Sequence, residues 1–377
     1  MRVIVVGAGA SGVLFALAYK RSHHKDEVIL LEHKEEPLKK ILATGNGKCN
    51  LGNTGPIKGI YNSSFAEEVI RNNDIKTQLA FLDSLNIKTK DVNGLIYPIS
   101  ESAVTVRNAL LKALEKANIK VYCSEEVNEY SVNDNSIDVY TNTNHFVADK
   151  LIISTGGNSS PSLGSDGSMF NILKDHGYII NPVNPGLCPI YVNENVKALD
   201  GVRVKANVTL LKNNKVIHKE SGEVLFKDKG LSGIVIFNIS RLIARESEAK
   251  YDIKIDFLPN VDDEDLGIFL SFNSSEDLLN AYLHPKLATY LLKENKSGFD
   301  LISTIKRHHF SYKKSYGFEF SQISVGGLSL KEIKENFESK REHNVFFIGE
   351  VLDVDGPCGG YNLMWAFGSA LDASSHI

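Results

Sequence analysis

The first 32 residues constrain the fold of this chain more than any other stretch. A β-branched run at 2–6 has the composition of a buried parallel strand. It is followed at once by three glycines in the spacing G-x-G-x-x-G, namely Gly7, Gly9 and Gly12. Apolar residues then recur at helical spacing, and a second apolar run at 28–31 ends at Glu32. This order predicts a βαβ unit at the start of the fold.

Each part of this motif has a mechanical reason to hold a dinucleotide. Gly7 allows a tight turn, Gly9 lets the backbone approach a pyrophosphate, and Gly12 lets the helix pack close to the strand. The helix N-terminus presents free N–H groups to the phosphates. Glu32 lies 20 residues after Gly12, where a carboxylate can accept hydrogen bonds from a ribose diol. We therefore predict an adenine dinucleotide site.

The alternative interpretation of this stretch is a secretory signal peptide. Arg2 would supply the positive end and the run 16–18, Ala-Leu-Ala, the cleavage site. The positive end is a single residue, however, and glycine and serine interrupt the apolar core. A signal peptide would also leave the second strand and Glu32 without explanation, so the βαβ unit is favoured.

Composition narrows the class of protein. The chain has 377 residues, which predicts two or three domains. A net charge of −4, without a long charged tail, argues against broad binding of nucleic acid or anionic membranes. No apolar stretch is long and clean enough to span a bilayer. The four cysteines form no C-x-x-C, so neither a metal site nor a redox dithiol is indicated, and a reducing, cytoplasmic setting is expected.

The stretch 39–53, KKILATGNGKCNLGN, is the next one that points to a ligand. It is rich in glycine and asparagine and has no hydrophobic period, which is typical of a loop that approaches a ligand closely. Lys40 and Lys48 can face phosphates or the edge of a flavin ring. The alternative is an ordinary surface loop. Cys49 lies in this loop, and nothing in the sequence indicates a lowered pKa for its thiol.

Two later stretches repeat the pattern of the first residues, an apolar strand that runs into a glycine-rich turn. The apolar run 151–154 leads into Thr155, Gly156 and Gly157, and a strand expected at 345–348 leads into Gly349 and Glu350. A glycine-rich segment, 359–362, then precedes a helix expected at 363–373. Backbone amides at such a helix start favour an anion, and a reduced flavin is an anion along its N1–O2 edge.

The rest of the chain has a mixed pattern. We expect helices at 65–87 and 103–117 and a β-meander at 126–147. From about 190 the residues alternate as in antiparallel strands, with a helix at 235–245, and 262–306 is mostly helical. A basic cluster follows at 306–314, for which a nucleic-acid contact is less favoured than a solvated helix face, given the acidic total.

Four stretches, KKILATGNGKCN, STGGNSSPSLGSDG, KGLSG and GEVLDVDGPCGGYNLMWA, carry a resemblance to a known family. The chain resembles the FAD-dependent oxidoreductases called NAD(P)/FAD-dependent or aminoacetone oxidase family flavoproteins, among which are reductases of dehydro bile acids. The segment QISVGGL, 322–328, is similar to a strand of that family, and the resemblance spans nearly the whole chain.

The resemblance implies an α/β fold with a Rossmann-like FAD domain made of two dinucleotide-binding folds. This domain would be discontinuous, over 1–189 and 338–377. A β-rich domain would be inserted at 190–254 and 316–337, and a small helical subdomain at 255–315.

The resemblance also implies which residues hold FAD. The glycine-rich start would hold the pyrophosphate, Glu32 the adenosine ribose, and the stretch after 154 the ADP part. Loop 39–53 would line the flavin side, Glu350 the ribityl-phosphate region, and the start of the last helix the isoalloxazine edge. The implied contacts are Gly7, Gly9, Ala10, Ser11, Gly12, Glu32, Lys40, Gly47, Lys48, Cys49, Asn50, Val127, Thr155, Gly156, Gly157, Gly349, Glu350, Asp355, Gly360, Tyr361, Asn362 and Leu363.

Three positions depart from the family pattern. Lys48 stands where arginine is usual, so a planar bidentate contact becomes a point charge. Asn46 stands where glycine is usual, and Met364 replaces a frequent glutamine near the flavin edge. We expect these changes to affect substrate preference rather than FAD binding.

The expected reaction is hydride transfer between a small-molecule substrate and flavin N5. The sequence does not decide between two other redox partners for the flavin. One is NAD(P)H, which would dock transiently, and the other is oxygen, as in an amine oxidase of the aminoacetone type. No catalytic acid or base is assigned, although Asp353, Asp355, Cys358 and Tyr361 lie near the predicted flavin. A tRNA-modifying enzyme and a non-catalytic flavin-binding protein are the alternatives from other classes. The oligomeric state does not follow from the sequence.

Overall fold

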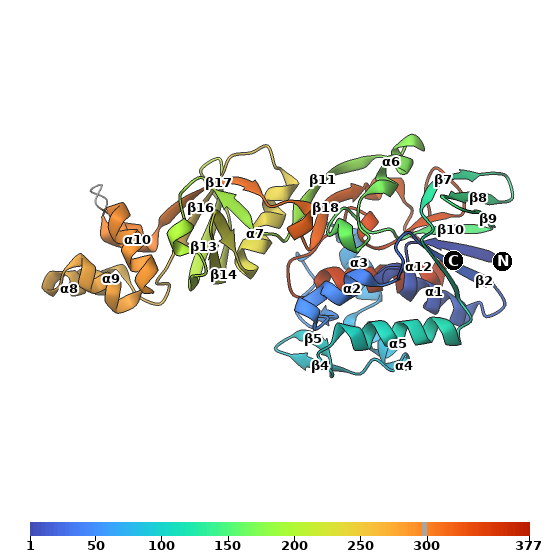
Figure 1. The fold of residues 1–377 in the computed structure, drawn as a ribbon, viewed down its shortest axis with the longest axis horizontal. Helices are drawn as coiled ribbons and strands as arrows, with labels where there is room; N and C mark the ends of the chain where they lie inside the picture. Colours follow the sequence, from blue (N-terminus) through green and yellow to red (C-terminus); the bar gives the residue numbers. More distant parts are fainter. Residues whose placement is uncertain (296–299) are drawn as a thin grey trace. The chain divides into compact units, whose positions relative to one another are not determined.

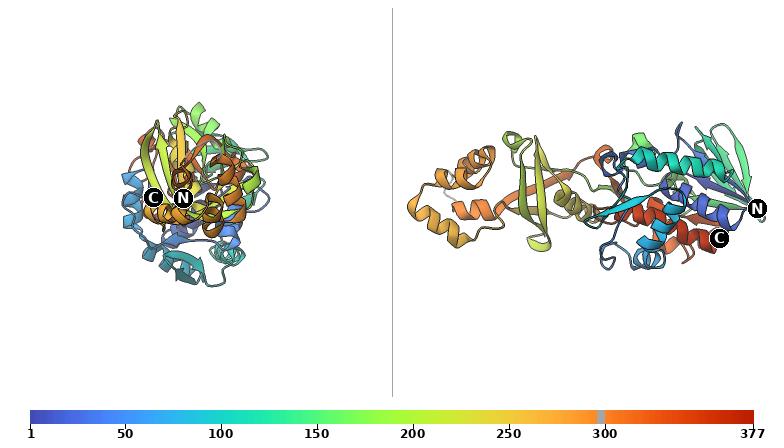
Figure 2. Two further views of the ribbon diagram at one scale, coloured as in Figure 1. Left: turned by 90° about the vertical axis from the view of Figure 1, so that its left-hand side faces the viewer. Right: turned by 90° about the horizontal axis from the view of Figure 1, so that it is seen from below.

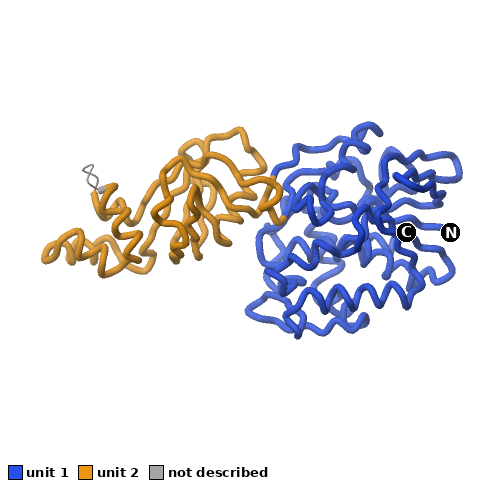
Figure 3. The backbone as a smooth tube through the Cα atoms, viewed as in Figure 1, with its two compact units in different colours: residues 1–184, 323–377 blue, residues 185–322 orange. Residues whose placement is uncertain are grey.

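The computed structural model describes residues 1–295 and 300–377, and these residues divide into two compact units. Unit 1 comprises Met1–Asn184 and Ile323–Ile377, and unit 2 comprises Pro185–Gln322 (Figure 3). Both ends of the chain belong to unit 1, and the right-hand view of Figure 2 shows the marks N and C beside elements of this unit. The chain therefore leaves unit 1 once, builds unit 2, and returns.

A five-stranded parallel sheet forms the centre of unit 1. Its strand order is β19 (Val345–Phe347), β10 (Lys150–Ile153), β1 (Arg2–Val6), β2 (Glu27–Glu32) and β6 (Lys120–Cys123). All four neighbouring pairs run parallel. The carboxyl ends of all five strands therefore meet at one edge of the sheet, which is where open α/β sheets bind ligands.

Helix α1 (Ala10–Ser22) packs against β1 and β2 of this sheet, and α5 (Ala103–Lys116) and α12 (Tyr361–His376) pack against α1 (Figure 1). All residues of α1 from Ser11 to Tyr19 are buried, and α12 packs along α1. A helix that is apolar on every side must be enclosed by other elements, and α1 lies between the sheet and its neighbouring helices. The two ends of the chain thus share one hydrophobic core.

The remaining helices and strands of this part of the chain are short. They are α2 (Lys39–Ala43), α3 (Ser64–Asn72), α4 (Ile75–Ser84), α6 (Ser168–Asp175), β3 (Gly52–Asn53), β4 (Thr89–Val92), β5 (Leu95–Pro98), β7 (Val127–Val132), β8 (Ile137–Thr141), β9 (His145–Ala148), β11 (Ile180–Gly186) and β18 (Ile323–Leu328). Strands β7, β8 and β9 form the meander expected at 126–147.

The helix expected at 65–87 is two helices. Helix α3 ends at Asn72, and Asp74 begins α4 by accepting a hydrogen bond from the Thr77 amide at 2.8 Å. Aspartate at this position satisfies an otherwise unpaired amide of the first turn. The helical period continues across the break, which is why the sequence pattern did not reveal it.

Unit 2 is built on a closed six-stranded antiparallel barrel. Its strands follow the order β12 (Ile190–Val192), β15 (Gly230–Ser232), β14 (Lys215–Lys227), β13 (Arg203–Lys212), β16 (Tyr251–Asp256) and β17 (His308–Ser315). Helix α7 (Ile234–Arg245) packs against β14. Between β16 and β17 the chain forms α8 (Asp263–Phe272), α9 (Ser275–Tyr282), α10 (Pro285–Asn295) and α11 (Leu301–Lys306). The expected helical stretch 262–306 is therefore observed, except that 296–299 lie outside the described residues.

The domain boundaries differ from the expected ones in three places. Residues 308–315, expected in the helical subdomain, form β17, which closes the barrel by pairing with β16 and β12. Residues 323–337, expected in the β-rich domain, belong to unit 1, because β18 pairs with β11 and Leu328 bridges to Leu352. The first crossing also comes earlier, after Asn184 rather than after 189.

The buried aromatic side chains of unit 2 allow a test of its hydrophobic core. Phe226 is fully buried, and its ring lies 6.2 Å from Phe257 and 6.1 Å from Phe310 between centroids. We expect Phe226→Ala to destabilise unit 2 by about 3–5 kcal/mol, through lost contacts and the cavity it leaves. Urea unfolding followed by circular dichroism measures this change. The control Val216→Ala, at a side chain that is 54% exposed, should shift the midpoint little; equal shifts would contradict the assigned core.

Candidate active site

Three strand-to-glycine turns meet at the carboxyl edge of the parallel sheet. Strand β1 leads into Gly7, β10 into Ser154, and β19 into the turn at Gly349. The Ser154 hydroxyl lies within 2.9 Å of the Val6 carbonyl and 2.8 Å of the Gly7 carbonyl, to which it can donate. These three turns are far apart in the sequence, and the parallel pairing of their strands brings them together.

The first glycine motif leaves an open space at one position only. A side chain at Gly7 would meet the Ser154 carbonyl oxygen at 2.7 Å, and Gly7 has a φ of +97°. A side chain at Gly12 would collide with the Gly7 carbonyl and the Ser154 hydroxyl. At Gly9 a Cβ would meet nothing within 4 Å. Gly7 and Gly12 are therefore required by the protein's own packing, whereas the space at Gly9 fits a ligand.

The N-terminus of α1 faces this space without a side-chain cap. The first N–H groups of a helix have no partner within the helix, so they are available to an anion. Ala10, Ser11 and Gly12 form this first turn. Ser11 is buried against Gly349, which begins the turn after β19.

Glu32 ends β2 in a fixed orientation. Its Oε2 accepts a hydrogen bond from the Ala8 amide at 3.0 Å, and its Oε1 accepts one from the Lys34 amide at 3.0 Å. The residue is only 8% exposed. A carboxylate has further lone pairs after these two bonds, so Glu32 can still accept hydrogen bonds from hydroxyl groups. Val127, from the implied set, is a buried residue of β7 in the same core.

Lys40 and Glu350 form an ion pair in the same unit. Lys40 Nζ donates to Glu350 Oε2 at 2.8 Å and to the Ser159 hydroxyl at 2.7 Å. Glu350 Oε1 accepts from the Ser324 amide at 2.8 Å and from the Ser159 hydroxyl at 3.1 Å. The two charges compensate each other, so this cluster presents hydroxyl and amide dipoles rather than a net charge.

The loop after β10 surrounds this cluster. Gly156 has a φ of +75°, and a side chain there would meet the Ser165 hydroxyl at 2.7 Å. Gly157 packs against Ser324, whose hydroxyl accepts from the Asn158 amide at 2.6 Å.

The Thr155 hydroxyl is buried and has no hydrogen-bond partner among the described residues. Such a group is costly unless something else satisfies it, and a bound ligand would do so.

The loop expected to line the flavin divides into exposed and buried parts. Asn46 adopts φ 54° and ψ 42°, a left-handed conformation that asparagine tolerates better than most residues, which explains how it replaces glycine there. A side chain at Gly47 would meet nothing within 4 Å. Lys48 is exposed and pairs with Glu101 at 2.9 Å, and Lys90 pairs with the same carboxylate at 2.6 Å. These two lysines lower the pKa of Glu101 to about 2.

Cys49 and Asn50 point inward from the same loop. Cys49 is fully buried, and burial raises the pKa of its thiol to about 11. Asn50, in the amide orientation that satisfies its neighbours, donates to the carbonyls of Ile96 and Gly52 and accepts from the Gly360 amide at 3.2 Å. Asn50 therefore joins the loop to the start of α12.

Helix α12 begins at Tyr361 after Gly360, which has a φ of +92° and supplies no side-chain cap. The Asn362 side chain bonds both the amide and the carbonyl of Gly356, at 2.8 and 2.9 Å, and so holds the preceding loop.

Trp365 Nε1 donates to the Gly349 carbonyl at 3.0 Å. Leu363 and Met364 belong to this first turn, and Leu363 is partly exposed. A second helix N-terminus without a side-chain cap is thus tied to the turn that follows β19.

The polar residues near the predicted flavin are deeply embedded. Asp355 and Asp353 are 2% and 8% exposed, and Asp353 accepts from the Asn181 side chain at 2.7 Å. The Tyr361 carbonyl accepts a hydrogen bond from the Tyr61 hydroxyl at 2.8 Å. None of these contacts singles out a catalytic acid. Among the described residues, no group of three histidine, cysteine or carboxylate side chains is arranged to hold a metal ion.

Sequence reasoning missed three serines of this site. Ser154, Ser159 and Ser324 bind the glycine turns and the Lys40–Glu350 pair. Ser159 lies inside the quoted stretch STGGNSSPSLGSDG and Ser324 inside QISVGGL, so the resemblance pointed to both segments without assigning either residue.

The basic cluster at 306–314 is not a helix face, and part of its charge is paired with carboxylates. Most of it belongs to β17 in unit 2. Lys306 pairs with Asp256 at 2.8 Å, Arg307 with Asp263 at 2.9 Å, and His309 Nε2 lies 3.1 Å from Asp252. These carboxylates offset the charges of Lys306 and Arg307, whereas Lys313 and Lys314 are exposed.

The groups at the carboxyl edge of the parallel sheet match what FAD needs from a binding site. A dinucleotide needs backbone N–H groups for its pyrophosphate, space where the backbone approaches it, and an acceptor for a ribose diol. The uncapped start of α1, the open space at Gly9 and the oriented carboxylate of Glu32 supply these three features. The buried Thr155 hydroxyl adds an unsatisfied polar group at the same edge.

Comparison with known proteins agrees with this geometry. A family model described as the HI0933-like protein Rossmann domain matches residues 1–376. The chain is 33% identical over 395 residues to a 3-dehydro-bile acid delta(4,6)-reductase of Clostridium scindens, covering 97% of this chain and 96% of that protein. It is 27% identical over 398 residues to a ribosomal RNA dihydrouridine synthase of Escherichia coli, covering 97% and 95%.

Solved structures show the same fold. The 3-ketosteroid-delta4-(5alpha)-dehydrogenase of Rhodococcus jostii aligns with a TM-score of 0.50 at 13% identity, over 99% of this chain and 96% of that one. Fold and site together define a Rossmann-type flavoprotein, an FAD-dependent oxidoreductase. Within that class, the chain belongs to the HI0933-like family. No helix in the described part of the chain has the length and apolar character needed to cross a membrane.

The buried position of Cys49 generates a chemical test. With a pKa of about 11, roughly one thiol in a thousand is ionised at pH 8. We therefore expect iodoacetamide to leave Cys49 unmodified in the native protein and to modify it once urea unfolds the chain. Mass spectrometry of the peptide measures this, with the partly exposed Cys123 as an internal comparison. Rapid native alkylation of Cys49 would contradict its burial.

Proposed function

We propose that this oxidoreductase saturates a carbon–carbon double bond that is conjugated to a carbonyl group. The observation that carries the proposal is that two curated relatives, each matching 97% of the chain, are named for the same type of change. One is a delta(4,6)-reductase of a dehydro bile acid and the other forms dihydrouridine, and both names describe loss of a double bond. The substrates differ greatly, so the shared chemistry is the stronger guide.

Reduced FAD, when bound, supplies a hydride from N5 for the substrate carbon farther from the carbonyl, and a proton added at the neighbouring carbon completes the saturation. The protein's own part is to bind, orient and exclude water. We propose that the N-termini of α1 and α12 stabilise the pyrophosphate and the N1–O2 edge of the ring, because both lack side-chain caps and favour negative charge.

The remaining residues of the site would orient the cofactor. Glu32 would accept from the ribose hydroxyls, since its carboxylate is already held by two backbone amides. The Thr155 hydroxyl would donate to the ADP part, and Lys40 with Glu350 would hold the ribityl-phosphate region through their shared serine. Asn50 would fix the flavin-side loop against the start of α12.

A pair of glycine variants tests where the pyrophosphate lies. Gly9 has an extended conformation, φ −82° and ψ −164°, with the negative φ that L-residues prefer, and a Cβ there meets open space. We expect Gly9→Val to fold normally but to bind FAD at least tenfold more weakly, which corresponds to about 1.4 kcal/mol or more. Flavin absorbance of the purified protein and FAD titration of the apoprotein measure this.

The matched variant Gly12→Ala should behave differently. Its Cβ collides with the Gly7 carbonyl, so we expect a loss of about 1–3 kcal/mol in folding free energy, measured by thermal unfolding of the apoprotein. A Gly9→Val protein that retains full flavin occupancy would place the pyrophosphate elsewhere.

The proposed reaction is tested with reduced enzyme in the absence of oxygen. We expect the dithionite-reduced flavoprotein to be reoxidised by 2-cyclohexenone or by a 3-oxo-4-ene steroid, with mass spectrometry showing the gain of two hydrogens. Cyclohexanone, which lacks the double bond, should leave the flavin reduced. Reoxidation by oxygen alone, with amines as the only reductants, would support the aminoacetone-type oxidase instead.

The electron donor forms the second half of the same experiment. We propose NAD(P)H as a transient co-substrate, because the sequence holds no second G-x-G-x-x-G motif for a resident nicotinamide. Anaerobic titration with NADH and then NADPH should bleach the flavin spectrum with one of them. A spectrum that neither nucleotide bleaches would contradict this donor.

A further inference from the structure

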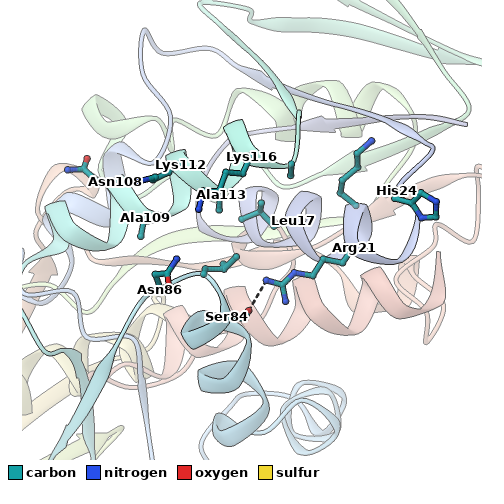
Figure 4. A pocket seen from close by; sticks show the side chains of 13 residues that line it. Leu17, Arg21, His24, Ser84, Asn86, Asn108, Ala109, Lys112, Ala113 and Lys116 are labelled. Atoms are coloured by element: carbon teal, nitrogen blue, oxygen red, sulfur yellow. Dashed lines mark hydrogen bonds between the residues drawn. The ribbon is translucent and has the colours of Figure 1, made fainter.

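A pocket of about 770 Å³ lies in unit 1 between α1, α5 and the turn that follows α4 (Figure 4). Ligand pockets for small organic molecules fall between about 300 and 1,000 Å³, so its size suits such a ligand. The residues that line it come from the C-terminal half of α1, from the middle and end of α5, and from 84–86.

This pocket is separate from the cofactor site. The dinucleotide motif ends at Gly12, in the first turn of α1, whereas the pocket is lined by residues from Leu17 to His24. A helix rises about 1.5 Å per residue, so Gly9 and Arg21 are ~18 Å apart along the axis of α1. A ligand here would not contact the groups assigned to FAD.

Part of the lining is apolar. It consists of Leu17, Leu85, Ala109, Ala113 and Ala117. The alanines of α5 recur at one-turn spacing and leave space where larger side chains would fill the gap to α1. Such a surface favours an apolar body of moderate size.

The polar part of the lining is strongly cationic. The pocket includes Lys20, Arg21, His24, Lys112 and Lys116, and no aspartate or glutamate lines it. Arg21 donates to the Ser84 hydroxyl at 2.7 Å and lies 4.2 Å from the centroid of the Phe81 ring, and Lys20 bonds the Asp26 carbonyl. These contacts position the two side chains without neutralising them.

Lys112 and Lys116 have no ion-pair or hydrogen-bond partner within the part of the chain that the structure describes. Two acidic residues that lie near lining residues in the sequence are engaged elsewhere: Asp83 pairs with Lys88 at 2.6 Å, and Asp26 accepts from the Tyr19 hydroxyl at 2.7 Å. The two lysines are spaced one helical turn apart, so both can reach the same ligand.

The helix dipoles do not cancel this charge. Lys20 and Arg21 lie in the last turn of α1, and Lys116 lies in the last turn of α5. Each helix C-terminus carries about half a negative charge, so two helices contribute roughly one. Four permanently charged side chains line the pocket, which leaves a clear excess of positive charge.

We propose that this pocket binds an amphipathic organic anion, with an apolar body against α1 and α5 and a carboxylate, sulfonate or phosphate at the lysines. The combination of an apolar lining with unpaired cations is what such a ligand requires. An RNA backbone fits less well, because a polyanion gains little from the alanine and leucine lining and the whole chain is acidic.

Two fluorescent probes that differ in one charged group test the proposal on the holoenzyme. 1-Anilinonaphthalene-8-sulfonate is anionic, and N-phenyl-1-naphthylamine has the same ring system without the sulfonate. We expect the sulfonate to bind more tightly than the neutral amine, and its affinity to fall as salt is added. Lys112→Gln/Lys116→Gln should weaken the sulfonate about tenfold and the amine less than twofold, as lost charge pairs alone would do.

Two further variants separate charge from shape. Lys205→Gln/Lys219→Gln makes the same change in net charge on the exposed face of unit 2, and it should leave both affinities unchanged. Ala113→Leu keeps all cations but fills the apolar lining, and it should weaken both probes. None of these residues belongs to the cofactor site, so the flavin spectrum serves as a check on folding.

Three results would overturn the proposal. The first is sulfonate binding that neither the lysine pair nor Ala113→Leu alters. The second is equal affinity for the charged and neutral probes. The third is binding of polyuridylate that depends on Lys112 and Lys116 and displaces the sulfonate, which would assign the pocket to RNA. Each result is independent of the proposed reaction, because the reductase test uses neither the probes nor these lysines.

Discussion

The close approach of the first glycine turn to the loop after β10 is the constraint on which the site depends. Gly12 has no room for a side chain, because the Gly7 carbonyl and the Ser154 hydroxyl occupy that space. Only at this separation can Ser154 bond the carbonyls of both Val6 and Gly7. The approach directs the N-terminus of α1 toward the edge where β1, β10 and β19 end. The uncapped N–H groups that we propose to hold the pyrophosphate owe their position to that orientation.

The sequence predicted the parts of the site that are local and left out those created by tertiary approach. The glycine spacing, Glu32 and the three strand-to-glycine turns are patterns within a few residues, so they can be read directly. The Lys40–Glu350 pair joins positions 310 residues apart, and Ser324 reaches it from a third segment. The family resemblance placed Lys40 and Glu350 near one cofactor, and no local pattern indicates that they bond each other.

The errors in the fold have a similar origin. The segment 308–315 was expected in the helical subdomain that the resemblance implied, yet it is a strand. His308 and Phe310 point into the barrel, while His309 meets Asp252 on the neighbouring strand. Burial lowers the pKa of His308 to about 4, so this histidine stays neutral at pH 7. Counting it among the cations therefore overstated the charge of the cluster.

Local charge, not total charge, decides where this protein can attract an anion. Lys306 and Arg307 face carboxylates that neighbouring segments supply, so a run that is conspicuous in the sequence presents less free charge than its residues suggest. Lys112 and Lys116 form no such run, and they face an apolar surface instead of acids. The pairing of a cation depends on which elements pack beside it. For that reason a chain with a net charge of −4 can hold one strongly positive pocket.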